Sequence, residues 1–287
     1  MSVSKPVSKQ HAPAAAVLLA VSLVAAPALT GALTAQAATA QSATANPATA
    51  HAASARALSG QAAHTGPAAR RPAVVESVVL GHTAENRPIR AWRVGDPEAR
   101  VTAVAMATLH GNEPAPRQIL RTLRDGPPVH GIDLWLLPVA SPDALVRRTR
   151  VNARGVDLNR NFPRLWTPQG GITPSGPGPA SEPETRALMR FFERVDPRFV
   201  VSFHQPLGGI DVNGPKMRWF ARRLADHLRM PRKTFACGSG CHGTFGQWFN
   251  HRFDGVAVTV ELGEHPTVQR LTGSAPRQLL AALGGRT

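Results

Sequence analysis

The chain has 287 residues and a formal net charge of +15, from 33 lysine and arginine residues against 18 aspartate and glutamate residues. The basic residues are scattered, without an aromatic-interleaved basic helix or zinc-finger spacing, so we do not expect nucleic acid as a partner. The charge favours attraction to anionic surfaces such as cell-wall polymers, although an arginine-rich genome would produce the same excess.

The first 37 residues have the three parts of a secretory signal peptide. Lys5 and Lys9 give a positive start, residues 12–29 form an apolar run, and residues 35–37 (Ala-Gln-Ala) offer a cleavage site. A membrane anchor is the alternative, but the run is short and contains prolines. We therefore predict a signal peptide over 1–37 and a secreted or cell-wall-associated protein without stable membrane insertion after cleavage.

The segment after the cleavage site has a different composition. Residues 38–72 consist mainly of Ala, Thr, Ser, Gln and Pro, with Leu58 as the one large aliphatic residue. Such a stretch cannot bury enough apolar surface to offset its ordering entropy, which predicts a disordered linker or a pro-segment. Residues 73–287 remain as one globular domain with a sizeable core.

Strand-like and helix-like patterns alternate along this domain. The expected strands cover residues 74–80, 88–94, 101–109, 132–139, 199–203 and 256–262. The expected helices cover a stretch from the prolines at 114 and 116 to Arg124, then 181–194, 216–228, 243–250 and 275–283. The first two strands alternate apolar and polar residues and predict a hairpin, whereas the later strands are continuously apolar. Ser181 and Glu184 have capping-box spacing. The alternation predicts an α/β sheet covered on both faces.

Three polar residues follow or end the apolar strands of this predicted sheet. His110, His204 and Glu261 lie at carboxyl ends of strands, where open α/β sheets bind ligands. Two histidines and a glutamate are a sufficient ligand set for a catalytic zinc with an open position for water. Here the set would be His110, His204 and Glu113, which follows His110 by three residues. The alternative for His110 is an ordinary loop histidine.

Five motifs resemble those of the zinc metallocarboxypeptidase family, the carboxypeptidase A-like peptidases, and most of all the bacterial group related to murein peptide amidase A. They are His-Gly-Asn-Glu (110–113), Arg-Val-Asn-Ala-Arg-Gly-Val-Asp-Leu-Asn-Arg-Asn-Phe-Pro (150–163), Ser-Glu-Pro-Glu (181–184), Ser-Phe-His (202–204) and Thr-Val-Glu-Leu (259–262). The resemblance covers roughly residues 74–283. It implies a single α/β domain with a mixed, mostly parallel central sheet flanked by helices on both faces.

The resemblance also implies a metal site and a base. His110, Glu113 and His204 correspond to the ligands of one zinc ion per chain. Glu261 corresponds to the general base, with Glu264 as a nearby competitor that lies in a Gly-Glu-His-Pro loop. Burying a lone charge is costly, so a carboxylate at the end of an apolar strand must be paired or functional.

Three further residues resemble substrate-binding groups of the family. Arg150 corresponds to the arginine that stabilises the oxyanion, and its spacing of nine residues from Asn159 selects it over Arg147 and Arg148. Asn159 and Arg160 correspond to the pair that holds a substrate carboxylate, a task suited to a guanidinium. The alternative for this pair is a surface loop with an ordinary ion pair.

The chain departs from the family by having no tyrosine. Carboxypeptidases of the family usually carry a tyrosine over the active site, and the corresponding region here is residues 241–248, in which His242 is a candidate substitute. The departure argues against ordinary protein C-termini as substrates. The chain has two cysteines, Cys237 and Cys241, for which we predict a disulfide, with a redox pair or metal ligands as alternatives.

The sequence therefore predicts an exported zinc peptidase that hydrolyses an amide bond beside a free carboxylate. The resemblance implies a murein stem peptide as the substrate, cut at the γ-D-glutamyl–diaminopimelate bond. The alternatives are a general metallocarboxypeptidase or an aspartoacylase-like amino-acid deacylase, and a wall-binding pseudoenzyme. The sequence leaves the oligomeric state open, with a monomer favoured.

Overall fold

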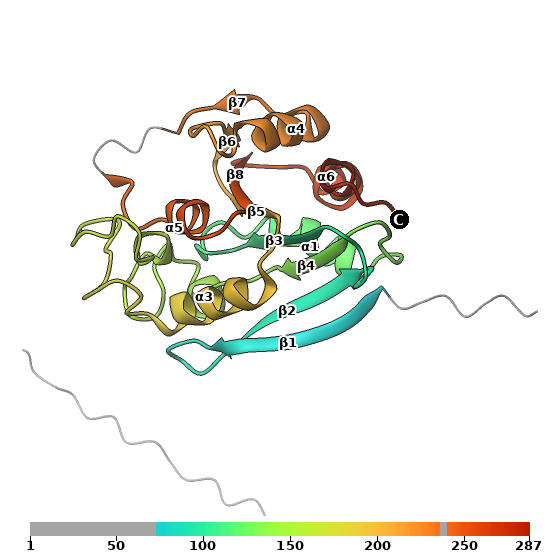
Figure 1. Cartoon of the computed structure of the whole chain (residues 1–287). Coiled ribbons are helices and arrows are strands. Elements are labelled where there is room, and N and C mark those ends of the chain that lie inside the picture. The colour runs from blue at the N-terminus through green and yellow to red at the C-terminus, as the bar shows by residue number, and fades with distance from the viewer. Residues whose placement is uncertain (1–72, 236–239) are drawn as a thin grey trace, which may run out of the picture. The chain divides into compact units, whose positions relative to one another are not determined.

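The computed structural model describes residues 73–235 and 240–287 (Figure 1). The predicted signal peptide (1–37), the predicted linker or pro-segment (38–72) and Cys237 lie outside the described residues. These predictions, including the Cys237–Cys241 disulfide, therefore stay predictions. Across the part of the chain that the structure describes, no helix is both long enough and apolar enough to cross a bilayer.

An eight-stranded sheet runs through the described residues in the order β1-β2-β4-β3-β5-β8-β6-β7. Its strands are β1 (Val74–His82), β2 (Pro88–Gly95), β3 (Thr102–Ala107), β4 (Asp133–Leu137), β5 (Phe199–His204), β6 (Leu207–Asp211), β7 (Arg232–Lys233) and β8 (Val256–Gly263). The central strands β4, β3, β5 and β8 are parallel, whereas the β1–β2 hairpin and β6 join them through antiparallel pairings. The sheet is mixed with a parallel centre, as predicted.

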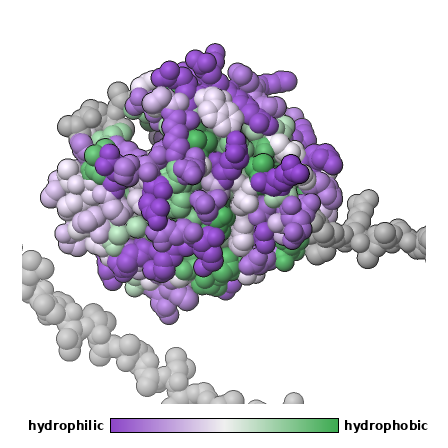
Figure 2. All heavy atoms as spheres, in the orientation of Figure 1, coloured by the Kyte–Doolittle hydropathy of each residue, from purple (hydrophilic) through white to green (hydrophobic). Residues whose placement is uncertain are grey.

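Helices cover both faces of this sheet. They are α1 (Arg117–Arg124), α2 (Pro142–Arg147), α3 (Pro183–Val195), α4 (Arg218–Leu228), α5 (Phe245–Arg252) and α6 (Ala275–Leu283). Successive side chains of a strand point to opposite faces, so Ala103 and Ala105 of β3 pack with α1, α4 and α6, whereas Val104 and Met106 pack with α3 and α5. With apolar side chains in these two cores, hydrophilic residues cover most of the face seen in Figure 2.

All six predicted strands and all five predicted helices are present, with shifts of a few residues at their ends. The sequence did not predict α2, β6 or β7. Strand β6 reads Leu-Gly-Gly-Ile-Asp and β7 has two residues, so neither carries enough alternation to show a strand pattern. Helix α2 has six residues and lacks room for a clear apolar stripe.

The predicted capping box at Ser181 and Glu184 is wrong. Helix α3 has Glu182 as its N-cap, without a capping hydrogen bond from a side chain. The Ser181 hydroxyl donates to the Glu182 carboxylate over 2.8 Å, and the Glu184 carboxylate accepts from Asn152 Nδ2 over 3.2 Å. Glu184 is fully buried, so its contact with a neighbouring loop replaces the local contact that the spacing suggested.

A capping box does form at the start of α5. The Thr244 hydroxyl accepts from the Gln247 backbone N–H, and the Gln247 side chain accepts from the Thr244 backbone N–H. The preceding Gly243 has φ +64°, and a Cβ there would lie 2.5 Å from the Arg160 carbonyl oxygen. Only glycine allows the two backbone segments to lie this close. The Phe162 N–H also donates a hydrogen bond to the Gly243 carbonyl oxygen. The start of α5 is thereby held against the segment that carries Arg160.

Candidate metal centre

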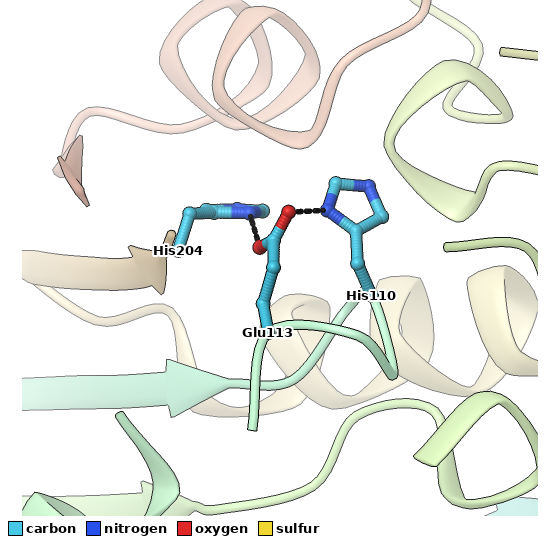
Figure 3. A group of neighbouring side chains, drawn as sticks. All are labelled: His110, Glu113 and His204. Carbon is cyan, nitrogen blue, oxygen red and sulfur yellow. Dashed lines mark hydrogen bonds and ion pairs between the residues drawn. The ribbon is translucent and has the colours of Figure 1, made fainter. Parts of the chain in front are cut away.

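Two adjacent parallel strands bring the three predicted metal ligands together (Figure 3). His204 is the last residue of β5, and His110 follows β3 after a turn in which Thr108 has φ +58°. A β-branched residue rarely adopts this left-handed conformation, so surrounding contacts must hold the turn. His110, Glu113 and His204 are all buried, and one potential ligand atom from each lies within 4.8 Å of the others.

The Glu113 carboxylate lies between the two imidazoles. Its oxygens are 2.8 Å from His110 Nδ1 and 2.9 Å from His204 Nδ1. Burial alone would raise the pKa of Glu113, but the two imidazoles hold it well below its usual range. The residues fit zinc, because two imidazole nitrogens and a carboxylate converge in a buried place and all three residues line the cavity.

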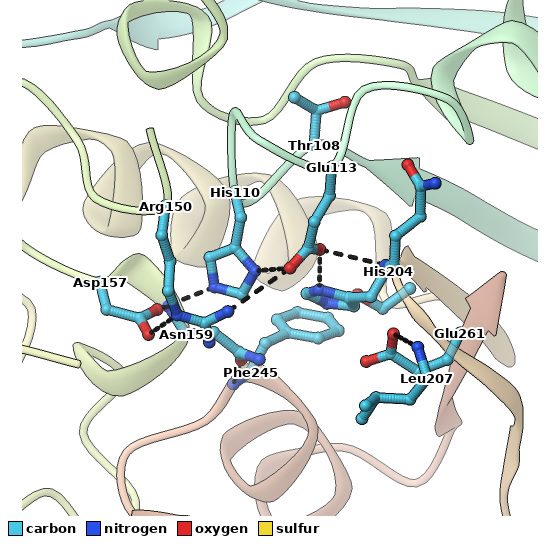
Figure 4. A network of polar contacts seen from close by, with 12 residues as sticks. Thr108, His110, Glu113, Arg150, Asp157, Asn159, His204, Leu207, Phe245 and Glu261 are labelled. Atoms are coloured by element: carbon cyan, nitrogen blue, oxygen red, sulfur yellow. Dashed lines mark hydrogen bonds and ion pairs between the residues drawn. The ribbon is translucent and has the colours of Figure 1, made fainter. Parts of the chain in front are cut away.

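Asp157 contacts the trio through His110, a role that its position in the 150–163 motif did not predict. One of its oxygens lies 2.9 Å from His110 Nε2, and the other accepts from Arg150 Nε over 2.9 Å (Figure 4). Burial would raise the pKa of Asp157, but His110 and the arginines lower it to about 2. A carboxylate on the second nitrogen of a ligand histidine fixes its orientation and increases its basicity.

Ser202 makes the equivalent contact with the second histidine. Its hydroxyl oxygen lies 3.2 Å from His204 Nε2, and both side chains are buried. The two residues are two positions apart on β5, so they point to the same face of the strand. This period of two is a signal in the sequence that could have identified Ser202.

The structure places Glu261, and not Glu264, beside the trio. Glu261 lies opposite His204 in the pairing of β8 with β5 and lines the same cavity. Its carboxylate accepts from the Leu207 N–H over 3.3 Å, and burial raises its pKa. The Glu264 side chain is 76% exposed and does not line this cavity.

Among the three candidate arginines, Arg150 reaches the centre. Its Nη1 lies 3.4 Å from a Glu113 oxygen, in addition to the Asp157 contact. Arg147 instead pairs with Glu85 on the outside of α2, and Arg148 is exposed. Arg150 is thus a cation held beside the His110–Glu113–His204 trio by two carboxylates.

Asn159 and Arg160 line the same cavity, which has a volume of about 540 Å³. The Asn159 amide oxygen accepts from the Phe245 N–H over 2.9 Å. Arg160 Nη1 donates to the Asn159 carbonyl oxygen over 2.7 Å, but its buried Nε has no hydrogen-bond partner among the described residues. No carboxylate of the described residues forms an ion pair with Arg160, and burial lowers its pKa. His242, the candidate substitute for tyrosine, is not among the cavity-lining residues.

Comparison with known proteins identifies the family. A family model described as zinc carboxypeptidase matches residues 128–206. Murein peptide amidase A of Escherichia coli (strain K12) is 32% identical over 175 residues, a match that covers 55% of this chain and 69% of that protein. The chain belongs to the zinc carboxypeptidase family.

Solved structures of a murein-tripeptide amidase and of a carboxypeptidase share the fold of this domain. The murein-tripeptide amidase of Escherichia coli O157 has 26% identity and a TM-score of 0.62, over 76% of this chain and 96% of that one. Carboxypeptidase A of Helicoverpa armigera has 20% identity and a TM-score of 0.62, over 74% of this chain and 69% of that one. As a zinc carboxypeptidase, the protein is a metallopeptidase, and the His110–Glu113–His204 trio is a place that could hold its metal.

Replacing Asp157 by asparagine should weaken metal binding. The Asp157→Asn change keeps the shape but removes the charge that orients His110, so the zinc Kd should rise roughly 10- to 100-fold. Competition with a fluorescent chelator measures this constant. Asp226→Asn on exposed α4 removes the same charge away from the site and serves as the control. An unchanged zinc Kd in Asp157→Asn would limit Asp157 to holding Arg150.

Proposed function

We propose that this protein is an exported zinc-dependent peptidase that hydrolyses an amide bond beside a free carboxylate in cell-wall peptides. The observation that carries the proposal is Arg160, a buried cation with an unsatisfied Nε and no carboxylate partner among the described residues, in the cavity that also holds the His110–Glu113–His204 trio. A substrate carboxylate bound there would supply the missing charge and hydrogen bond.

The residues around the cavity fit amide hydrolysis. Bound by His110, Glu113 and His204, zinc would supply Lewis-acid polarisation of the carbonyl and would lower the pKa of a water molecule. Glu261 accepts the proton of the attacking water and returns it to the leaving amine, a role that its raised pKa suits. Arg150, fixed by Asp157, stabilises the negative charge that develops on the carbonyl oxygen. Arg160 and Asn159 orient the substrate through its carboxylate.

The scissile bond that we propose is the γ-D-glutamyl–diaminopimelate bond of murein stem peptides. The similarity to two murein peptide amidases supports this choice. The absence of tyrosine from the chain supports it too, because the family's usual transition-state contact over the active site is lost while the rest of the site is kept. The basic charge of the chain favours attraction to anionic wall polymers.

Export is proposed from the sequence of residues 1–37, which has the charge, apolar run and cleavage site of a signal peptide. Such a protein would meet its substrate in the wall or outside the cell. A peptide substrate is the partner that we propose.

Product analysis tests the proposed function directly. The purified, zinc-loaded protein should release diaminopimelate or diaminopimelate-containing peptides from γ-D-glutamyl-diaminopimelate substrates, as detected by mass spectrometry. Hippuryl-type substrates should be cleaved poorly. A preference for hippuryl substrates would favour a general carboxypeptidase, preferred cleavage of N-acyl amino acids would favour a deacylase, and no hydrolysis of any substrate would reject the enzyme hypothesis.

Replacing Glu261 by glutamine should separate metal binding from turnover. The Glu261→Gln change removes the base without removing a proposed ligand, so zinc content should be unchanged while kcat falls roughly 10²- to 10⁴-fold. Metal analysis and steady-state kinetics on one sample measure both quantities. Glu264→Gln, on an exposed loop, is the matched control and should resemble the wild type. The opposite result for the two variants would transfer the role of base to Glu264.

Replacing Arg160 by alanine should affect only substrates that carry the carboxylate. We expect kcat/KM for the free-carboxylate peptide to fall roughly 10- to 100-fold, because a hydrogen-bonded charge pair is lost. Cleavage of the same peptide with that carboxylate amidated should be poor in the wild type and little changed in Arg160→Ala. Arg164→Ala, an exposed arginine of the same segment, is the control. Equal wild-type cleavage of both peptides would exclude carboxylate recognition by Arg160.

A further inference from the structure

The cavity contains a second charge that forms no ion pair with any described residue, the carboxylate of Asp211. Asp211 is the last residue of β6 and lines the same cavity as Arg160 and Glu261. The preceding Ile210 is fully buried in the core beside α4, so the alternation along β6 turns Asp211 to the other face of the sheet. The Gly-Gly-Ile-Asp sequence of this short strand gave no sign of a site.

Asp211 is partly buried, and the hydrogen bonds that its carboxylate accepts from described residues come from backbone groups. The Asn213 N–H donates to Oδ1 over 2.9 Å, and the backbone of Phe235 also forms a hydrogen bond to the side chain. Among the residues that the structure describes, no cationic side chain lies within ion-pair distance of it. A carboxylate offers about four acceptor positions, so it can still accept hydrogen bonds from a ligand.

The two lysines of the described residues, Lys216 and Lys233, donate hydrogen bonds to backbone carbonyl groups instead. Lys216, which also lines the cavity, donates to the carbonyl oxygens of Asn250 and Phe253. Lys233, which is paired with Asp211 between β6 and β7, donates to the Leu207 carbonyl oxygen over 2.7 Å. Neither lysine neutralises Asp211, so the negative charge remains directed at the cavity.

We propose that Asp211 is a specificity-determining residue that binds an ammonium group on the side chain of the residue whose carboxylate Arg160 holds. This inference rests on the proposed function, in which the residue held by Arg160 is released with its amino group free. A cavity with an unpaired guanidinium and an unpaired carboxylate matches a leaving residue that carries both charges, such as diaminopimelate or lysine. Binding would replace solvent at both groups with charge-assisted hydrogen bonds.

Two substrates that differ only in the ammonium group test the proposal. One is γ-D-glutamyl-diaminopimelate and the other is the same peptide with 2-aminopimelate, which lacks the distal ammonium group. In the wild type, kcat/KM should be at least roughly tenfold higher for diaminopimelate, as expected for a hydrogen-bonded charge pair. In Asp211→Asn the two values should lie within about twofold of each other, because only the diaminopimelate value falls.

The ratio of the two kcat/KM values is measured within each variant. Partial unfolding of Asp211→Asn would therefore lower kcat/KM for both peptides and leave their ratio unchanged. Asp226→Asn, an exposed acidic residue of α4, should keep the wild-type ratio. Equal cleavage of the two peptides by the wild type, or an unchanged ratio in Asp211→Asn, would overturn the role of Asp211 and leave the proposed hydrolysis standing.

A binding measurement separates this inference from the proposed function. Isothermal titration calorimetry with free diaminopimelate and free 2-aminopimelate reports recognition of the leaving residue without turnover. If neither peptide is hydrolysed but diaminopimelate alone binds, and Asp211→Asn abolishes the difference, the proposed function is wrong and Asp211 still recognises the ammonium group. Equal binding of the two amino acids by the wild type would reject the assignment of Asp211.

Discussion

The site depends on one buried carboxylate, Glu113, held between imidazoles from two neighbouring strands. A charged group without a partner in a dry interior costs much free energy, and here His110 and His204 lie within hydrogen-bond distance of its two oxygens. The pairing of β3 with β5 places the two histidines at the same edge of the sheet. The strand order therefore brings together the two imidazoles, and they in turn offset the cost of burying the charge of Glu113. The same contacts create the set of donor atoms for a metal.

The two arginines of the cavity differ in their ion pairs with the described residues. Asp157 binds both His110 and Arg150, so Arg150 is a fixed cation at the centre. Arg160 lies deeper, against the start of α5, and has no carboxylate partner among the described residues. Within the described residues, folding thus pairs Arg150 with two carboxylates and leaves Arg160 without one, and in the proposed function a substrate carboxylate would fill that place.

The family resemblance explains the chemistry better than it explains specificity. The trio, Glu261 and Arg150 are groups that any amide of suitable size could use. Specificity requires groups that contact the parts of the substrate away from the scissile bond, and the groups that we propose for this are the cavity-lining Asn159, Arg160 and Asp211. If both proposals hold, the opposite charges of Arg160 and Asp211 would favour a leaving residue that carries both a carboxylate and an ammonium group.

The sequence by itself determined the alternating strands and helices, because apolar periodicity is a local property. It also identified the residues of the trio, together with Glu261 and Arg150, because each lies in a compact motif. It did not reveal the contacts of Asp157 with His110 or of Asp211 with the cavity, since these join segments that only the strand order brings together. The misplaced capping box at Ser181 has the same cause: burial of Glu184 against Asn152 outweighed a local pattern. Local residue spacing is encoded in the chain, whereas the neighbours of a buried charge are decided when the sheet and its two helical layers assemble.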